Sequence, residues 1–598
     1  MNYVKKFLGG FTLESALRRL FTSVFITNIL LLLFNKGVSF ESKQLFEAVE
    51  GKIGFVGVVL LVLLLFIGES LISILKENEK LEKLLLFLSY CTYAYVCVLQ
   101  EKSIWFFVGA SLVLLGVCHY TFSDWEAKFK LPAFVTPLVL SSLGLFFALA
   151  IGFTTAGRVF SLHSPNFDFG IFSQMFYNMS QTGLAETTCE RNELLSHFAI
   201  HVSPVYYLML PFYMLVPHPA TLEFLQAILL ASGVIPLWLL AKKIGLSNKA
   251  VMAFATVYTL YPALSGGCYY DLHENKFLTP ILLWLFYFVE KNSGVGIAIF
   301  SVLLLSVKED AACYLVFLAI YMLIAGKNRK KAVLMLLGGI AYFGIVTFIL
   351  SQYGRGVMTW RYDNFIYGNG GLISMVKAVI MSPAKVISEI FNVTDKGYDT
   401  NKIEFILYML LPLGFLPFVS KKLSRFLLLC PLILVNLMPD YVYQYSISFQ
   451  YTYGSFAFLL YGAMLNYADL TPKFKRTVAS FVTIASILIF SASMNSRTKY
   501  FKMYLDDKEV YDTTYQALQE IPEEASVTAN TFLVVPLSQR AEIYDYDAKN
   551  FPETDYIVFD IRYSENAKEY EAKYKDNPDW QVEKLIEGRV VILKNIGD

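Results

Sequence analysis

Residues 163–201, HSPNFDFGIFSQMFYNMSQTGLAETTCERNELLSHFAIH, form the first long polar interruption in a chain that otherwise consists of successive apolar runs. This segment contains Asp168 and three of the six histidines of the chain, namely His163, His197 and His201. Because it lies between apolar runs, we expect it at the boundary between water and lipid. The rest of the chain is organised around it.

The composition indicates an integral membrane protein. Of the 598 residues, 56% are hydrophobic and only 17% are charged, whereas soluble domains carry about 25% charged residues. Apolar runs of about 20 residues, the length that crosses a ~30 Å hydrocarbon core, recur along the sequence. The chain is predicted to be an all-α polytopic protein of the cell membrane, with the lipid bilayer as its partner. A net charge of +1 gives no indication of a nucleic-acid partner.

The apolar runs predict about fifteen transmembrane helices. They occupy residues 20–36, 53–74, 83–99, 103–118, 132–154, 219–241, 249–266, 276–290, 294–307, 310–325, 332–351, 403–420, 425–438, 448–467 and 477–494. Basic residues before the first run, including Lys5 and Lys6, predict a cytoplasmic N-terminus. Residues 202–216 are short and interrupted by two prolines, so we expect them to be re-entrant or interfacial. The C-terminus then lies outside the cytoplasm.

Three domains follow from this pattern. Residues 1–131 form an N-terminal extension of four transmembrane helices, and residues 132–494 form a transmembrane core with an outer loop at 157–201. Residues 495–598 are charged and read as a small extracytoplasmic α/β domain. Its expected elements are strands at 526–529, 542–545 and 555–560, a helix at 564–575, and a hairpin of 582–586 with 589–593.

Asp168 is the first candidate for chemistry, since it lies between two phenylalanines just beyond a predicted helix. Desolvation there would raise its pKa towards that of a useful general base. Alternatively, Asp168 is an N-cap of the helix that begins near Ile171. The two interpretations are compatible.

His197 and His201 are four residues apart, so on a helix they would share one face and could bind one metal ion. No glutamate follows the first histidine, as the common zinc signature requires. The alternative is a pair of interfacial histidines bonded to the backbone or to lipid head groups.

Two short motifs lie on the same predicted side of the membrane. The first contains Asp271 and His273 in a tight turn, where charged groups are usually solvated helix caps. The second, Lys308-Glu309-Asp310, joins two apolar runs without glycine or proline and therefore lies near membrane depth. Ionisable residues at that depth are costly and indicate function. By contrast, the Asp545-Tyr546-Asp547 acidic motif lacks a nucleotide-binding context, and GNGG at 368–371 is not followed by the residues of a P-loop.

Four of these stretches resemble a known family. FDFGIFSQ (167–174), HVSP (201–204), YDLHENKF (270–277) and KED (308–310) look like the family of predicted membrane proteins called domain of unknown function 2079. The likeness is strongest over residues 132–350 and looser in the tail. The outer loop with a lone acidic residue, followed by a proline-containing segment, also resembles GT-C membrane glycosyltransferases.

The GT-C resemblance implies a glycosyltransferase that takes a hexosyl or pentosyl group from a polyprenyl-phosphate donor at the outer face. Asp168 would deprotonate the acceptor hydroxyl, with Glu309 and Asp310 as further catalytic candidates. The implied substrate contacts are Gln174, His201, Asp271, His273, Lys308, Arg355 and Arg361. Positive charge on the leaving phosphate would come from Lys308, Arg355 or Arg361, or from a divalent metal held by Asp168, His197 and His201, with Glu309 or Asp310. Asn166-Phe167-Asp168 is not the acidic pair of the oligosaccharyltransferases, so metal dependence stays open.

Two other functions fit the same sequence. A transporter or flippase of a lipid-linked or small polar substrate would use the broken segment and the hinge carboxylates as coupling elements. A non-catalytic membrane scaffold would use the tail to bind a partner, and its carboxylates and histidines would be scattered over the fold.

Overall fold

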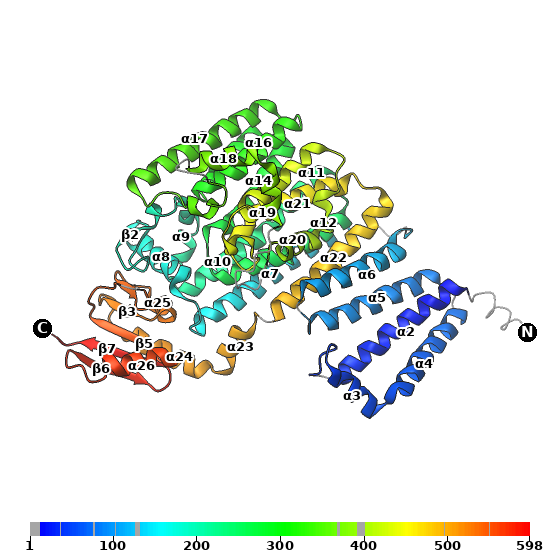
Figure 1. Ribbon diagram of the computed structural model, residues 1–598, viewed down its shortest axis with the longest axis horizontal. Coiled ribbons are helices and arrows are strands. Elements are labelled where there is room, and N and C mark those ends of the chain that lie inside the picture. The colour runs from blue at the N-terminus through cyan, green and yellow to red at the C-terminus, as the bar shows by residue number, and fades with distance from the viewer. Residues whose placement is uncertain are drawn as a thin grey trace, which may run out of the picture.

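The computed structural model describes residues 12–35, 37–75, 78–101, 103–125, 132–366, 371–391, 401–495, 497–548 and 550–597. The expectations for Lys5, Lys6 and most of the GNGG run lie outside these ranges. Figure 1 shows a helical core with the N-terminal helices at one end and the C-terminal sheet at the other.

Eight helical segments among the described residues are long and apolar enough to cross a membrane, and each coincides with an expected run. They are α2 (Leu13–Phe34), α4 (Gly54–Leu75), α5 (Glu79–Val98), α6 (Ile104–Phe122), α7 (Val135–Phe160), the pair α10 (Pro219–Ser232) and α11 (Val234–Ile244), α17 (Arg329–Tyr353) and α22 (Pro472–Asn495).

The expected count of about fifteen spans is not supported. The other seven runs form shorter elements: α12 (Asn248–Thr259) with α13 (Pro262–Gly266), α14 (Leu278–Lys291), α15 (Gly294–Leu305), α16 (Ala312–Ile324), α20 (Lys402–Leu410), α21 (Tyr453–Ala468), and the 3-10 and π turns Leu423–Leu429 and Leu432–Leu437. Twelve residues of α-helix extend only about 18 Å, against a hydrocarbon core of ~30 Å. Hydropathy alone does not distinguish a short helix buried in protein from a span: α21 is buried along its length.

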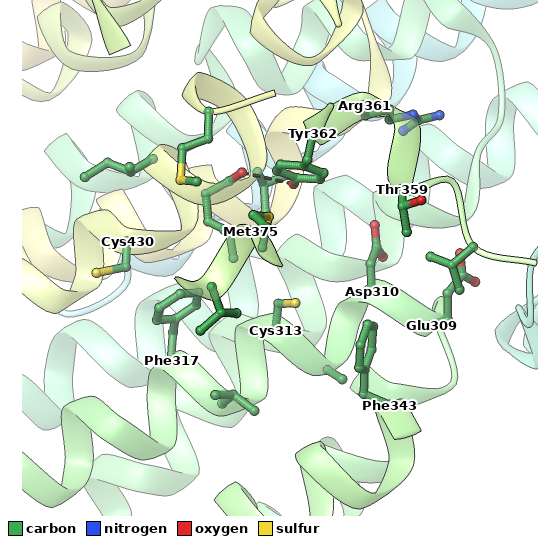
Figure 2. A pocket seen from close by; sticks show the side chains of 18 of the residues that line it. Glu309, Asp310, Cys313, Phe317, Phe343, Thr359, Arg361, Tyr362, Met375 and Cys430 are labelled. Carbon is green, nitrogen blue, oxygen red and sulfur yellow. Dashed lines mark hydrogen bonds between the residues drawn. The ribbon is translucent and has the colours of Figure 1, made fainter. Parts of the chain in front are cut away.

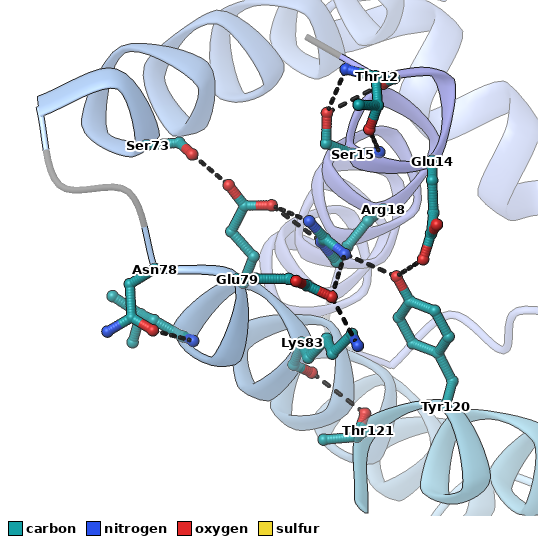
Figure 3. Close-up of polar contacts among 12 residues, drawn as sticks. Thr12, Glu14, Ser15, Arg18, Ser73, Asn78, Glu79, Lys83, Tyr120 and Thr121 are labelled. Carbon is teal, nitrogen blue, oxygen red and sulfur yellow. Dashed lines mark hydrogen bonds and ion pairs between the residues drawn. The ribbon is translucent and has the colours of Figure 1, made fainter. Parts of the chain in front are cut away.

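The N-terminal helices α2, α4, α5 and α6 pack on the core through the contacts of α5 and α6 with α22. A polar cluster lies inside this bundle. Arg18 and Arg19 of α2 are buried, and both pair with Glu82 of α5, at 2.7 and 2.9 Å. Figure 3 shows the Arg18 side chain directed between Glu79 and Tyr120, and Tyr120 Oη accepts a hydrogen bond from Arg18 at 2.6 Å.

The segment after α7, which the sequence predicts to be an outer loop, is irregular. A π turn (Asn166–Gly170) leads into α8 (Ile171–Thr182), and short strands and a 3-10 turn (His197–Ala199) follow. Residues 202–216 form no long helix, only a 3-10 turn (Pro204–Leu208) and α9 (Leu210–Tyr213). Each of these begins with a proline in its first turn, the effect expected from the two prolines of the segment.

The C-terminal region contains α23 (Lys499–Asp506), α24 (Lys508–Gln519), α25 (Thr531–Leu537) and α26 (Ser564–Lys573) around a five-stranded sheet. The strand order is β4 (Ile543–Asp545), β3 (Val527–Ala529), β5 (Tyr556–Asp560), β7 (Val590–Asn595) and β6 (Trp580–Ile586). β3 is parallel to both its neighbours, and the last three strands are antiparallel. The sequence-based strands, helix and hairpin of this region are thus confirmed, with small differences at their ends.

The outer segment is bonded to the edge of this sheet. Asn192 donates to the carbonyl of Asp545 and accepts from its amide, both at 2.8 Å, so that it pairs with β4 as a neighbouring strand would. Asn166 donates to the Asp545 carboxylate at 2.9 Å. The acidic motif at Asp545 is therefore part of this junction, and the junction fixes the segment that carries Asp168.

Candidate functional site

A cavity of about 310 Å³ lies between the outer segment, the turn before α14 and the segment after α17. Residues that are far apart in the sequence line it together, among them Asp168, His201, His273, Lys308 and Arg361. This volume is at the lower end of the range of small-molecule sites, ~300–1,000 Å³.

Asp168 faces this cavity and is not a helix cap. Gly170 occupies the N-cap position of α8 without any side-chain cap bond, so the N-cap interpretation is wrong. The Asp168 carboxylate, 26% exposed, lies with Oδ2 3.5 Å from Nε2 of His273. Burial raises the pKa of Asp168, but the hydrogen bond and charge of His273, with a hydrogen bond from Tyr270, lower it below its ordinary value. The pKa of Asp168 is thus lowered and not raised as the sequence predicted, so its carboxylate carries a negative charge.

Glu274 lies at the centre of the polar network under the cavity. Its buried carboxylate accepts a hydrogen bond from Tyr206 Oη at 2.7 Å, and its two oxygens lie 2.9 Å from Nζ of Lys308 and 2.7 Å from Nδ1 of His273. Burial raises the pKa of Glu274, but His273 and Lys308 hold it well below its ordinary value. Its negative charge in turn raises the pKa of Lys308 against the effect of burial. The charge of Lys308 is therefore already compensated.

Glu309 and Asp310, the two carboxylates in the turn between α15 and α16, have different surroundings. Glu309 accepts a hydrogen bond from Nδ1 of His201 at 2.9 Å and one from the amide of Val202 at 3.3 Å, which ties the turn before α16 to the broken segment. Asp310 has no hydrogen-bond or ion-pair partner among the described residues and lines a second cavity. Desolvation raises the pKa of Asp310 to about 6, with Lys308 opposing the shift and Glu309 adding to it.

This second cavity measures about 570 Å³ and is mainly apolar. Side chains from α16, α17, α18 (Gly371–Met381) and the turns near Cys430 form its walls. Figure 2 shows Asp310, Glu309 and Arg361 at one end and Phe317 and Cys430 at the other. It shares four residues with the first cavity, His201, Lys308, Met358 and Arg361, so the two spaces adjoin at a charged boundary.

Arg361 stands at this boundary among aromatic rings. Its guanidinium carbon lies 4.6, 5.1 and 5.6 Å from the ring centres of Tyr441, Tyr451 and Trp360. In the described part of the chain Arg361 has no carboxylate within ion-pair distance; its Nη2 donates to Sδ of Met358 at 3.3 Å, and its buried Nε lacks a hydrogen-bond partner. Cation–π contacts retain the positive charge without neutralising it. The geometry leaves Arg361 able to bind an anion.

Three expected substrate contacts lie outside both cavities. The buried amide of Gln174 bonds to the loop and tail, with its nitrogen 2.9 Å from the carbonyl oxygen of Ala541. Asp271 pairs with Arg158 at 2.8 Å and braces the turn before α14. Arg355 pairs with Glu193, and both side chains are 48% exposed. These three residues therefore brace the fold around the site and do not line it.

The predicted metal ligands do not form a metal site. No group of three or more histidine, cysteine, aspartate or glutamate residues suited to a metal ion occurs in the ranges that the structure covers. His197 begins a 3-10 turn (His197–Ala199) and His201 lies beyond its end, so the two are not on one α-helix, and their ring centres are 6.0 Å apart. Nδ1 of His197 faces Glu190 at 3.4 Å, and Nδ1 of His201 is bonded to Glu309. These residues do not fit a shared ion with Asp168.

Sequence reasoning missed two parts of the site. Glu274 follows His273 in one of the motifs named above, but nothing in the sequence shows that it contacts two other segments, through Tyr206 and Lys308. The rings around Arg361 carried no signal, because aromatic residues make up 16% of the chain.

The likeness noted in the sequence is confirmed by comparison with known families. The family described as predicted membrane protein, DUF2079, matches residues 158–588. The match begins near the end of α7 and includes both cavities and most of the C-terminal sheet, while the N-terminal helices lie outside it. No curated protein matches the chain. Since the match covers more than half of the sequence, the chain belongs to the DUF2079 family of predicted membrane proteins.

Proposed function

We propose that this protein transfers a sugar from a polyprenyl-phosphate donor to a hydroxyl acceptor at the membrane boundary. One observation carries the proposal: Arg361, a cation without a carboxylate partner among the described residues, stands where an apolar cavity meets a polar one. A lipid-linked sugar has the same order of parts, with an apolar chain, an anionic phosphate and a polar ring.

The donor would lie across the two cavities. Its polyprenyl chain fills the apolar cavity beside α16 and α17, and its phosphate binds Arg361. A guanidinium suits this role because it presents several fixed donors to phosphate oxygens. Lys308 adds to the electrostatic potential at the phosphate but is not a free charge, since Glu274 already compensates it. The sugar and the acceptor then occupy the cavity that contains Asp168.

The chemistry is a single displacement. Asp168 takes the proton of the acceptor hydroxyl while the acceptor oxygen bonds to the anomeric carbon. The bond from that carbon to the phosphate oxygen breaks, and its electron pair leaves with the polyprenyl phosphate, whose charge Arg361 stabilises. One displacement inverts the anomeric configuration. His273, held between Asp168 and Glu274, orients the carboxylate towards the acceptor.

We further propose where the reaction and the domains lie relative to the membrane. The reaction is on the outer face, residues 132–494 form a GT-C-like core, and the tail of residues 495–598 lies outside the cytoplasm and positions the acceptor. The bonds between Asn166, Asn192 and Asp545 support a tail that acts together with the loop of Asp168.

The test is the variant Asp168→Asn, assayed with a panel of polyprenyl-phosphate hexoses and pentoses. Because a general base typically contributes about 10²–10⁴-fold, release of polyprenyl phosphate should fall by that factor. The matched control is Asp363→Asn, an exposed aspartate two residues after Arg361. Mass spectrometry of the released lipid measures the rate, and membrane yield reports folding. Full turnover in Asp168→Asn, or no turnover by the wild type with any donor of the panel, would refute the proposal.

A further inference from the structure

A third space lies apart from the two cavities. It is an open cleft of about 520 Å³ between the end of α7, the start of α10 and the tail helices α23 and α24. None of its lining residues lines either of the other two cavities. Figure 1 shows α23 and α24 leading from α22 towards the C-terminal sheet, so the cleft lies where the tail meets the helical core.

One side of the cleft is a row of four rings, Tyr504, Phe160, His218 and Tyr515. Successive ring centres are 5.2, 5.8 and 5.9 Å apart, and successive planes differ by 29°, 28° and 27°. The His218 ring is fixed because its Nδ1 accepts a hydrogen bond from the amide of Ala220 at the start of α10. The row is therefore an ordered aromatic surface.

The polar lining of the cleft is a stripe on α24, the helix that also carries Tyr515, and Tyr504 of the row donates a hydrogen bond to Asp512 of the stripe at 3.1 Å. Asp512, Gln516 and Glu520 are spaced by four residues, which places them on one face of the helix and its C-cap, and all three line the cleft. Both carboxylates have basic partners: Asp512 pairs with Lys508, and Glu520 pairs with Lys584 at 2.5 Å. Gln516 is exposed. The stripe thus offers hydrogen-bond donors and acceptors without net charge.

We propose that this cleft binds a neutral saccharide chain. The C–H faces of a sugar ring are apolar and pack on aromatic rings, while its hydroxyls bond to amide and carboxylate groups such as those of α24. The volume lies within the ~300–1,000 Å³ range of ligand sites. A cationic ligand would also favour aromatic rings, but the carboxylates that would attract it are already paired. The site is separate from the proposed transfer reaction and does not depend on it.

The experiment measures binding without turnover. Full-length protein in lipid nanodiscs is titrated with linear glucan, mannan and N-acetylglucosamine oligomers, and saturation-transfer NMR identifies the bound sugar protons. At least one oligomer should bind saturably. Tyr504→Leu and Gln516→Ala should each weaken its binding about tenfold, through lost stacking and lost hydrogen bonds. Tyr504→Phe, which keeps the ring, should retain most of the affinity.

The matched control for Gln516→Ala is Gln581→Ala, an exposed glutamine on β6 outside the cleft. The melting temperature of each variant separates loss of binding from loss of folding. Three results would overturn the inference: no oligomer of the panel binds, binding is unchanged in both cleft variants, or oligolysine binds the cleft and the sugars do not. Because the titration needs no donor, its failure is distinguishable from a failure of the transferase proposal.

Discussion

Two arginine sites in this protein, the buried pair Arg18 and Arg19 and the half-buried Arg361, have opposite surroundings. In the N-terminal bundle, Arg18 and Arg19 share the carboxylate of Glu82, and Ser73 and Tyr120 accept further hydrogen bonds from them. At the boundary of the two cavities, Arg361 faces aromatic rings, with no carboxylate within ion-pair distance in the described ranges. The first group lines a space of only about 40 Å³, whereas Arg361 lines cavities of about 310 and 570 Å³.

The comparison separates a structural charge from one that we propose binds a ligand. A buried charge is tolerated only when a partner compensates for its lost hydration. In the bundle the protein supplies that partner from its own chain, so the group fixes the helices to one another. At Arg361 the protein supplies aromatic rings and two adjoining cavities, and an anionic ligand bound there would compensate the charge of the guanidinium group.

The largest expected effect comes from breaking the compensated group. Glu82→Gln leaves two buried guanidinium groups without their carboxylate, which should cost about 3–5 kcal/mol. The melting temperature in detergent should fall clearly below that of the control Glu47→Gln, an exposed glutamate in α3 (Lys43–Lys52). Equal melting temperatures for the two variants would show that the bundle arginines are not held as described.

At the cavity boundary, the same kind of change should affect the ligand rather than the fold. Arg361→Gln should leave the melting temperature of the ligand-free protein unchanged, because no ion pair is lost. It should weaken the apparent affinity for a polyprenyl-phosphate sugar by about 10–100-fold, the equivalent of about 1.5–3 kcal/mol for a charge-assisted hydrogen bond. Arg355→Gln, a paired and half-exposed arginine of the same loop, is the control. Similar losses in both variants would contradict the assignment.

The same comparison can be made for an uncharged group, the side chain of Asn192 at the junction with the tail. Asn192→Ala would remove two hydrogen bonds, leaving the amide of Asp545 in β4 without its side-chain acceptor and its carbonyl with the amide of Ala548 alone. We expect a loss of about 1–3 kcal/mol, seen as faster hydrogen exchange in residues 543–545. Asn577→Ala, at a turn in the same tail, should leave that strand protected. Unchanged exchange in Asn192→Ala would mean that the loop does not stabilise β4.

The smallest effect is a pH dependence at the same boundary. Since the pKa of Asp310 is raised to about 6, this carboxyl is neutral below that pH and negative above it. The apparent affinity for the phosphate of the donor should therefore rise a fewfold as the pH falls from about 8 to 5, because repulsion by Asp310 disappears. In Asp310→Asn this dependence should be absent and the affinity high throughout. A dependence that persists in the variant would assign it to another group.

Hydropathy located every long helix, because about twenty apolar residues in succession have few other uses. It failed for α12, α14 and α16, where apolar composition reflects burial against protein and the helices are too short to be classified by periodicity. It failed also for α15, which is equally short although most of its apolar side chains are not buried. Short apolar runs bounded by turn residues were sufficient to locate β3 and β5 of the tail sheet, since both strands are buried along their whole length.

The site was predictable in part for similar reasons. Asp168, His201, His273 and Arg361 were identified as candidates, and the structure gathers them around one cavity. Their partners were not predictable, because Glu274 acquires its role only when the turns before α14 and α16 meet. The same contact places Lys308 under Glu274 and so removes it as the free phosphate ligand that its charge suggested.

The junction between Asn192 and β4 has a practical consequence for mapping membrane orientation. Reporter enzymes are often attached to progressively shortened chains, and a chain cut after α22 would lack the strand that Asn166, Thr188 and Asn192 bond to. The loop of Asp168 would then present unpaired polar groups, and the fragment could insert differently from the intact protein. Reporters inserted into the complete chain, or placed after β7, avoid this error.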